Sequence, residues 1–242
     1  MAKNKNSFTF LEHIGELRKR ILYSFAIIFF FFIIAWSYRV SIYNFLSIPV
    51  TQFLNGKKLI YTSLAEPLMM YVKLSFIGAL FASSPLLFHQ LWLFVSPGLY
   101  KKEKKMLLPF VTMATAFFIM GAAFGYYIAF PMYVEFLLNF GSSFEQMIKI
   151  NEYFSQLLVV LLGLAAMFEL PVIMYLLAKL KLITSAFLIK YLKYAIVLIF
   201  ILAAVITPTP DIINQSIFAF PTIGLYLLSI LIVKVVRKNE EK

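Results

Sequence analysis

The sequence lacks cysteine altogether and carries little charge. The absence of cysteine from all 242 residues excludes disulfide bonds and thiol chemistry. Only 14% of the residues are charged, whereas 62% are hydrophobic and the mean hydropathy is +0.88. A water-soluble domain of this length has too little interior to bury so much apolar surface. The composition therefore predicts an all-α integral membrane protein.

Residue types that carry catalysis are also scarce. The chain has two histidines, His13 and His89, and a single aspartate, Asp211. An intramembrane protease would need a Ser/His pair, two aspartates or a zinc motif, and neither H-E-x-x-H nor G-x-S-x-G occurs in the sequence. These absences argue against an enzyme, and we expect neither a metal nor a cofactor.

Six apolar stretches reach or approach the length of about 20 residues that a helix needs to cross a bilayer. They are residues 21–36, 68–95, 106–130, 153–177, 192–206 and 212–233. The first follows a basic segment, as a signal peptide would, but the five later stretches favour a retained helix. We therefore expect one membrane domain, a bundle of six transmembrane helices.

Basic residues are distributed very unevenly between the two sides of this predicted bundle. If the N terminus is cytoplasmic, the cytoplasmic segments carry 17 Lys and Arg residues, the external segments carry four, and Lys73 lies within a span. Positive charge concentrates on the cytoplasmic side of membrane proteins. Both termini are therefore expected in the cytoplasm, and the net charge of +11 requires no nucleic-acid partner.

The segments outside the spans contain recognisable helix and turn signals. The external segment 38–66 is long and half apolar, so we expect short helices that cap the bundle, with turns at Pro49 and at Asn55-Gly56. At the N terminus, Thr9 and Glu12 have the spacing of a capping box. This spacing predicts a helix that starts at Thr9 and continues into the first span.

Three prolines and the single aspartate are expected to shape helix ends and bends. Pro85 interrupts the second predicted span, near the polar pair His89 and Gln90, for which we expect a structural polar contact. Asp211 follows Pro208 and Pro210, and this order predicts that Asp211 caps the sixth helix.

Two carboxylates lie in strongly basic surroundings on the predicted cytoplasmic side. Glu103 is the centre of "YKKEKKM", residues 100–106, and Glu16 precedes three basic residues. Glu16 could simply pair with Arg20 four positions on, and Glu103 with its lysines. If the two segments meet, however, they form an acidic site with a basic rim, which suits a guanidinium group.

A third carboxylate, Glu169, lies inside the apolar stretch "LAAMFELPVI". An ionised carboxylate at the centre of a membrane helix costs roughly 2.5–3.5 kcal/mol. Pro171 follows two residues later and favours a kink, because proline cannot donate a backbone hydrogen bond. We therefore expect Glu169 to be protonated, hydrated in a cavity, or bonded to a partner group, for instance in a structural bond within the bundle.

Four motifs together resemble the TatC family, the polytopic receptor subunit of the twin-arginine protein translocase. They are "HIGELRKRI" at 13–21, "SPGLYKKEKK" at 96–105, "FELP" at 168–171, and "TPTPD" at 207–211 followed by Gln215. They occur in the family's order and cover nearly the whole chain. The departures are small: Gly15 replaces a larger apolar residue, and Lys104 and Lys105 stand where arginine is frequent.

This resemblance implies a receptor of the bacterial cytoplasmic (inner) membrane that binds signal peptides with consecutive arginines on folded cargo. It implies recruitment of the single-span partners TatA and TatB, homo- and hetero-oligomers within membrane lipid, and transport driven by the proton-motive force. Glu16 and Glu103 would contact the arginine pair. The supporting residues at that site would be Arg18, Leu99 and Tyr100.

Within the membrane, the resemblance implies that Glu169 helps to dock partner helices, together with the polar residues Thr207 and Gln215. A proton-coupled secondary transporter is the alternative function, since six spans and one buried carboxylate permit it. Inverted repeats and paired broken helices, which many transporters contain, are not evident in the sequence.

Overall fold

The structure, a computed structural model, describes most of the chain. It covers residues 10–51, 59–95, 107–141, 143–207 and 211–240. Its elements are α1 (Phe10–Ser37), α2 (Arg39–Thr51), α3 (Glu66–Val95), α4 (Leu107–Phe124), the π-helical turn η3 (Gly125–Ala129), α5 (Phe130–Phe140), α6 (Ile150–Phe168), α7 (Leu170–Lys179), α8 (Ser185–Lys190), α9 (Leu192–Ile206) and α10 (Ile212–Glu240). The predicted all-α class is confirmed for the described residues.

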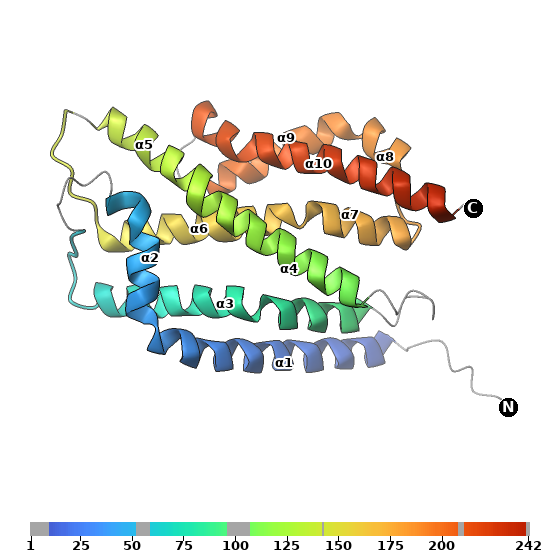
Figure 1. Ribbon diagram of the computed structural model, residues 1–242, viewed down its shortest axis with the longest axis horizontal. Coiled ribbons are helices and arrows are strands. Elements are labelled where there is room, and N and C mark those ends of the chain that lie inside the picture. The colour runs from blue at the N-terminus through green and yellow to red at the C-terminus, as the bar shows by residue number, and fades with distance from the viewer. Residues whose placement is uncertain (1–9, 52–58, 96–106, 142, 208–210, 241–242) are drawn as a thin grey trace.

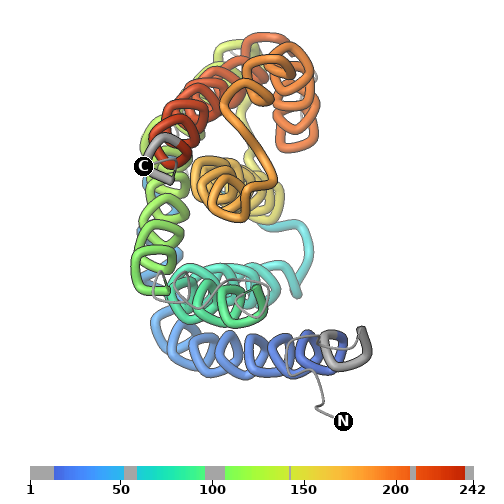
Figure 2. Tube along the Cα trace, turned by 90° about the vertical axis from the view of Figure 1, so that its right-hand side faces the viewer, coloured from blue at the N-terminus to red at the C-terminus, as the bar shows by residue number. Residues whose placement is uncertain are grey.

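The long helices form a bundle that curves around α6 and α7 (Figure 1). Helix α1 packs along α3, α4 packs against both α3 and α6, and α10 packs against α7 and α9. Seen along the helices, α1, α3, α4 and α10 follow one another around the central pair (Figure 2). The core accordingly centres on α6, whose buried side chains include Phe154, Leu157 and Leu164.

Five segments are long and apolar enough to cross a membrane, judged by length and composition. They are Ile14–Ser37, Glu66–Val95, Leu107–Phe140, Ile150–Lys179 and Ile212–Arg237. The predicted fifth span is the helix α9, which has only 15 residues and is shorter than the other five. The count of six spans and the cytoplasmic placement of both termini therefore stay predictions.

The third segment extends further than the sequence suggested. The predicted span ends at Phe130, next to Pro131, whereas the helical segment continues through η3 and α5 to Phe140. Pro131 lies in the first turn of α5, where the missing N–H of proline is tolerated. The preceding π-helical turn, closed by the bond from Phe130 N–H to Gly125 O, lets the chain continue past the proline.

The expected turn at Pro49 was wrong, because Pro49 lies inside α2. A proline there leaves the carbonyl of Phe45 without its usual donor four residues later. The hydroxyl of Tyr126 donates a hydrogen bond to that Phe45 carbonyl, and Tyr153 donates to the next one, Leu46, at 3.0 Å. Side chains of the bundle therefore replace the missing bond and hold the second half of α2 against η3 and α6. Asn55-Gly56 lies outside the described residues.

Pro85 is accommodated in a similar way within α3. Its missing N–H leaves the carbonyl of Phe81 without a helical donor. The buried Ser84 hydroxyl donates to Phe81 O at 2.7 Å and takes over that role. The long helix α3 therefore passes the proline without ending.

Helices α4 and α6 approach each other closely at Gly121. A Cβ atom at this position would lie 2.7 Å from Leu164 O and 2.8 Å from Ala165 Cα, both backbone atoms of α6. Small residues at helix interfaces allow such close approach, which matters most where lipid provides no hydrophobic driving force. Gly121 therefore holds α4 directly against the central helix.

Candidate functional site

The first candidate site lies where α1 begins. Helix α1 runs without interruption from Phe10 into the apolar stretch, while the predicted cap Thr9 lies outside the described residues. Arg20 Nη2 donates to Glu16 Oε1 at 3.2 Å, so the local ion pair is present. Arg20 Nη1 also donates to Gln90 Oε1 of α3 at 3.2 Å. A polar chain of three side chains thus joins α1 to α3.

The side chains of this polar chain are only partly buried. The side chains of Arg20 and Glu16 are 24% and 19% exposed, which is too open for a strong pair, and such pairs contribute up to about 1 kcal/mol. Arg20 and Gln90 line a groove of about 170 Å³ between α1 and α3, beside apolar side chains such as Leu17 and Phe94. The carboxylate of Glu16 therefore has a guanidinium partner that solvent or a ligand can replace.

The remaining predicted residues of this site are only partly described. Arg18 is exposed, and it lies two positions from Glu16, so it points to a different side of α1. Glu103, Leu99 and Tyr100 lie outside the described residues. The end of α3 and the start of α4, which flank that segment, lie at the same end of the bundle as the start of α1 (Figure 1). Whether Glu16 and Glu103 meet stays a prediction.

The second candidate site is the break between α6 and α7, where Glu169 stands alone between two helices. Pro171 lies in the first turn of α7, and the N–H groups of Val172 and Ile173 donate to Glu169 O at 3.0 and 2.9 Å. The Glu169 side chain is buried, with 8% of the residue exposed. Within the described part of the chain, its Oε1 has no hydrogen-bond partner. A buried acceptor without a donor is rare and marks a functional candidate.

The polar residues at the junction of α9 and α10 bond within the chain. Buried Thr207 donates from Oγ1 to Ala203 O at 3.0 Å, and Gln215 donates from Nε2 to Phe200 O at 2.8 Å. Neither of them hydrogen-bonds Glu169 in the regions that the structure describes, so no hydrogen bond joins the three residues predicted for partner docking there.

The start of α10 has the geometry of a capped helix. Asp211 Oδ1 accepts a hydrogen bond from the backbone N–H of Asn214 at 2.7 Å, and Asp211 Oδ2 accepts one from Asn214 Nδ2 at 2.9 Å. The first of these bonds is the one that an N-cap residue makes to the third helical position. Pro208 and Pro210 lie outside the described residues.

Sequence analysis missed the partners of Lys73, which was recognised only as a cation within a span. Its amine donates to Asn151 Oδ1 at 2.8 Å and to Ser155 Oγ at 3.1 Å, both on α6. The spacing of four between Asn151 and Ser155 at the start of an apolar helix was an available signal. For metals, the described residues contain no group of three or more His, Cys, Asp or Glu side chains.

Comparison with known proteins places this geometry in a family. Residues 12–221 match the family described as Sec-independent protein translocase protein (TatC). The chain is 47% identical over 227 residues to the Sec-independent protein translocase protein TatC of Helicobacter pylori (strain J99), covering 93% of this chain and 88% of that protein. It is 40% identical over 239 residues to the protein of the same name from Koribacter versatilis, covering 97% and 88%.

A solved structure agrees with this match. The chain is similar to the crystal structure of a twin-arginine translocase receptor, TatC, with a TM-score of 0.82 and 30% identity over 93% of this chain and 99% of that one. The described helices are therefore those of a multi-pass membrane protein. The chain belongs to the TatC family of Sec-independent protein translocase proteins.

Proposed function

We propose that this protein is the receptor and core component of a twin-arginine translocase. It binds the arginine-pair signal peptides of folded proteins at its cytoplasmic face and recruits single-span partners of the TatA and TatB type. The proton-motive force then drives export. Membership of the family and the likeness to a translocase receptor support this proposal.

The observation that carries the proposal is the guanidinium already bound at Glu16. Arg20 occupies one oxygen of this carboxylate at 3.2 Å, so the local geometry admits a planar, forked cation. A carboxylate has two oxygens and about four acceptor positions, so Oε2 remains for a second guanidinium. An arginine of a signal peptide would bind there and displace or join Arg20.

Glu103 supplies the other half of the proposed site. Its segment connects α3 to α4, whose neighbouring ends lie at the same end of the bundle as the start of α1 (Figure 1). Each charge-assisted hydrogen bond contributes about 1.5–3 kcal/mol, so removing one carboxylate should weaken peptide binding roughly 10- to 100-fold. Lysine cannot bond both oxygens of a carboxylate from a planar fork, which makes the site selective for arginine.

Glu169 is the proposed contact for a partner helix inside the membrane. Thr207 and Gln215 use their hydrogen bonds within the chain, whereas Glu169 Oε1 is a buried acceptor without a partner in the described regions. A donor on a single-span helix would satisfy it. We therefore assign signal recognition to Glu16 and Glu103, and partner docking chiefly to Glu169.

One experiment separates this proposal from the proton-coupled transporter. The purified full chain would be titrated with a twin-arginine signal peptide and with its twin-lysine version, and reconstituted vesicles would be tested for proton-coupled solute uptake. We expect clear preference for arginine, weakened by Glu16→Gln but not by Glu152→Gln. Glu152 is a suitable control because it pairs with Lys149 at 3.3 Å, away from this site. Solute uptake without peptide binding would favour the transporter.

A further inference from the structure

Lys73 is a cation inside a membrane-spanning helix that lacks an anionic partner. It lies seven residues after Glu66, where α3 begins, which is about 10 Å along the helix axis. Its two hydrogen-bond acceptors, Asn151 Oδ1 and Ser155 Oγ, are both neutral. An ammonium group has three donors, so one N–H remains. Among the described residues, no carboxylate lies within ion-pair distance of Lys73.

The nearest carboxylates on the same two helices have other partners. Glu66 accepts hydrogen bonds from the backbone N–H and the hydroxyl of Thr62, at 2.7 and 3.1 Å. Glu152, next to Asn151 on α6, pairs with Lys149. The charge of Lys73 is therefore not neutralised by these groups, although intramembrane cations are costly and mark ligand sites.

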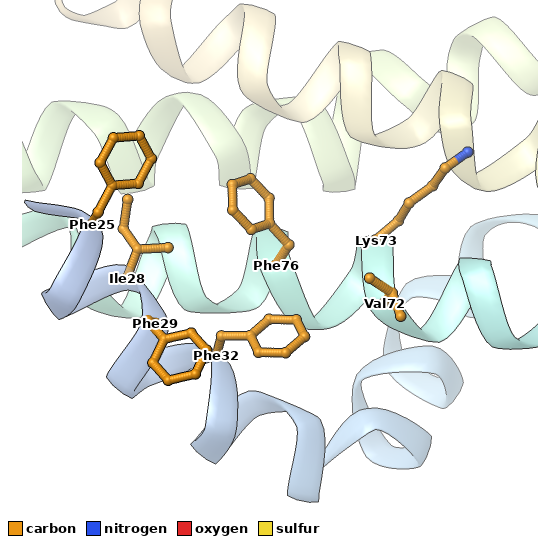
Figure 3. Close-up of a pocket in the computed structure, with 7 residues that line it drawn as sticks. All are labelled: Phe25, Ile28, Phe29, Phe32, Val72, Lys73 and Phe76. Atoms are coloured by element: carbon orange, nitrogen blue, oxygen red, sulfur yellow. The ribbon is translucent and has the colours of Figure 1, made fainter.

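An apolar groove of about 450 Å³ adjoins Lys73 between α1 and α3. It is lined by the stem of Lys73 and by Phe25, Ile28, Phe29, Phe32, Val72 and Phe76 (Figure 3). Figure 3 shows the Lys73 amine at one end, pointing away from the phenylalanines and toward α6. Phe25 and Phe29 remain about two-thirds exposed, at 66% and 65%, so the described residues do not fill the groove.

We propose that this groove and Lys73 bind one anionic phospholipid. Its acyl chain lies against the phenylalanines, and its phosphate accepts a hydrogen bond from Lys73 Nζ between α3 and α6. The ligand must combine a long apolar part with an anionic end, because the groove is apolar along its length and the Lys73 amine lies beyond one end of it, directed toward α6. The volume falls within the range of about 300–1,000 Å³ that is typical of ligand sites.

The lipid belongs to the leaflet at which α3 begins, which is the external leaflet in the predicted orientation. Long side chains such as lysine direct their charge toward the membrane boundary, where phosphate groups lie. An anionic headgroup is favoured over phosphatidylcholine because the choline group carries a compensating positive charge. This site is independent of the proposed signal-peptide site.

The test is lipid binding by the full chain in detergent, followed by native mass spectrometry. Phosphatidylglycerol and phosphatidylcholine with the same acyl chains would be titrated against wild type, Lys73→Gln, Lys73→Arg and Lys149→Gln. We expect one phosphatidylglycerol bound at least tenfold more tightly than phosphatidylcholine by wild type. Lys73→Gln should reduce this preference below twofold, while Lys73→Arg and Lys149→Gln should retain it.

The acyl chain is tested separately with a tryptophan placed in the groove. Phosphatidylglycerol with brominated acyl chains should quench the fluorescence of Phe76→Trp more than that of wild type, whose tryptophans are Trp36 and Trp92. Adding Lys73→Gln should remove this excess quenching. Glycerol phosphate, which has no acyl chain, should not displace the lipid.

Wild-type lipid preference in a folded Lys73→Gln variant would overturn the proposal. Displacement of the lipid by glycerol phosphate would show that the site binds phosphate only and does not bind an acyl chain. If Lys73→Gln keeps the lipid preference but loses a cross-link from position 76 to a single-span partner, a protein helix occupies the groove instead.

Discussion

Glu16 and Glu169 are two carboxylates of the same chain in opposite situations. Glu16 lies near the start of α1, is partly exposed, and pairs with Arg20 at 3.2 Å. Glu169 lies at the break between α6 and α7, is buried, and has an acceptor oxygen without a partner in the described regions. Glu16 can therefore exchange Arg20 for another cation, whereas Glu169 Oε1 can accept a hydrogen bond without giving one up.

The difference follows from where each helix lies in the bundle. Few residues in the apolar part of Ile14–Ser37 are buried inside the structure, whereas most residues in the apolar part of Ile150–Lys179 are buried. The carboxylate of Glu16, on the outer helix, is therefore more accessible than that of Glu169, beside the central helix. The proposed roles, recognition for Glu16 and partner docking for Glu169, can be separated by mutation.

The largest expected effect is on transport. We expect Glu169→Ala to lower export of a folded twin-arginine reporter by at least tenfold, because it removes the acceptor for a partner helix. Affinity for the signal peptide should change less than twofold, since Glu16 is untouched. Glu152→Ala is the control and should leave export unchanged. Loss of peptide binding by folded Glu169→Ala would contradict the separate roles proposed for Glu16 and Glu169.

The next effect concerns the packing of the central helix. In Gly121→Ala the new Cβ would lie 2.7 Å from Leu164 O and 2.8 Å from Phe168 Cβ, so α4 must move away from α6. We expect a loss of about 1–3 kcal/mol in the free energy of unfolding in detergent. Because the contact adjoins Glu169, export should fall more than peptide binding.

The control for this packing is Gly224→Ala in α10. A Cβ at Gly224 would meet nothing within 4 Å. Alanine in an open helical position is neutral or stabilises by about 0.4–1 kcal/mol, because it restricts the unfolded chain. Equal destabilisation by both substitutions would show that the close approach at Gly121 does not account for its effect.

The helix break at Glu169 and the proline inside α2 show what the sequence can and cannot predict. The break at Glu169 was foreseeable, because Pro171 lacks an N–H and a carboxylate in an apolar stretch is unusual. The place of Pro49 inside α2 was not, since the donor that replaces its missing bond, Tyr126, comes from a distant helix. Local signals predict where a helix is weakened, but only tertiary contacts decide whether it ends.

The same limit applies to polar partners. The spacing of Glu16 and Arg20 gave their ion pair as one of two alternatives, because residues four apart share a helix face. The bonds of Arg20 to Gln90 and of Lys73 to Asn151 join residues far apart in the chain, and periodicity contains no information about them.

A smaller effect tests whether Arg20 competes with the signal peptide. We expect Arg20→Gln to bind a twin-arginine peptide about fivefold more tightly than Lys19→Gln, from a pair contributing up to about 1 kcal/mol. Both variants lose one positive charge near Glu16, so bulk electrostatics cancels in the comparison. Lys19 is a fair control because it lies over the ring of Tyr23. Weaker binding by Arg20→Gln would mean that Arg20 positions Glu16 and does not compete for it.

The smallest effect is on membrane thickness. Helix α9 has 15 residues, or about 22 Å of helix, against about 30 Å of hydrocarbon. A short helix draws the lipid inward, so we expect the bilayer to be several ångströms thinner beside α9 than beside α4. Spin labels along both helices would report the depth. Matching depth profiles would exclude thinning.

We propose that Glu16 and Glu103 together hold the two arginines of a signal peptide. The most direct measurement is a double-mutant cycle with Glu16→Gln, Glu103→Gln and the double variant, each titrated against twin-arginine and twin-lysine peptides. We predict that each single variant weakens binding roughly 10- to 100-fold and that the double variant loses less than the sum, because the two groups share one ligand. The double variant should barely distinguish arginine from lysine. Full discrimination by that variant would contradict the account and leave Glu103 as a counter-charge to its neighbouring lysines.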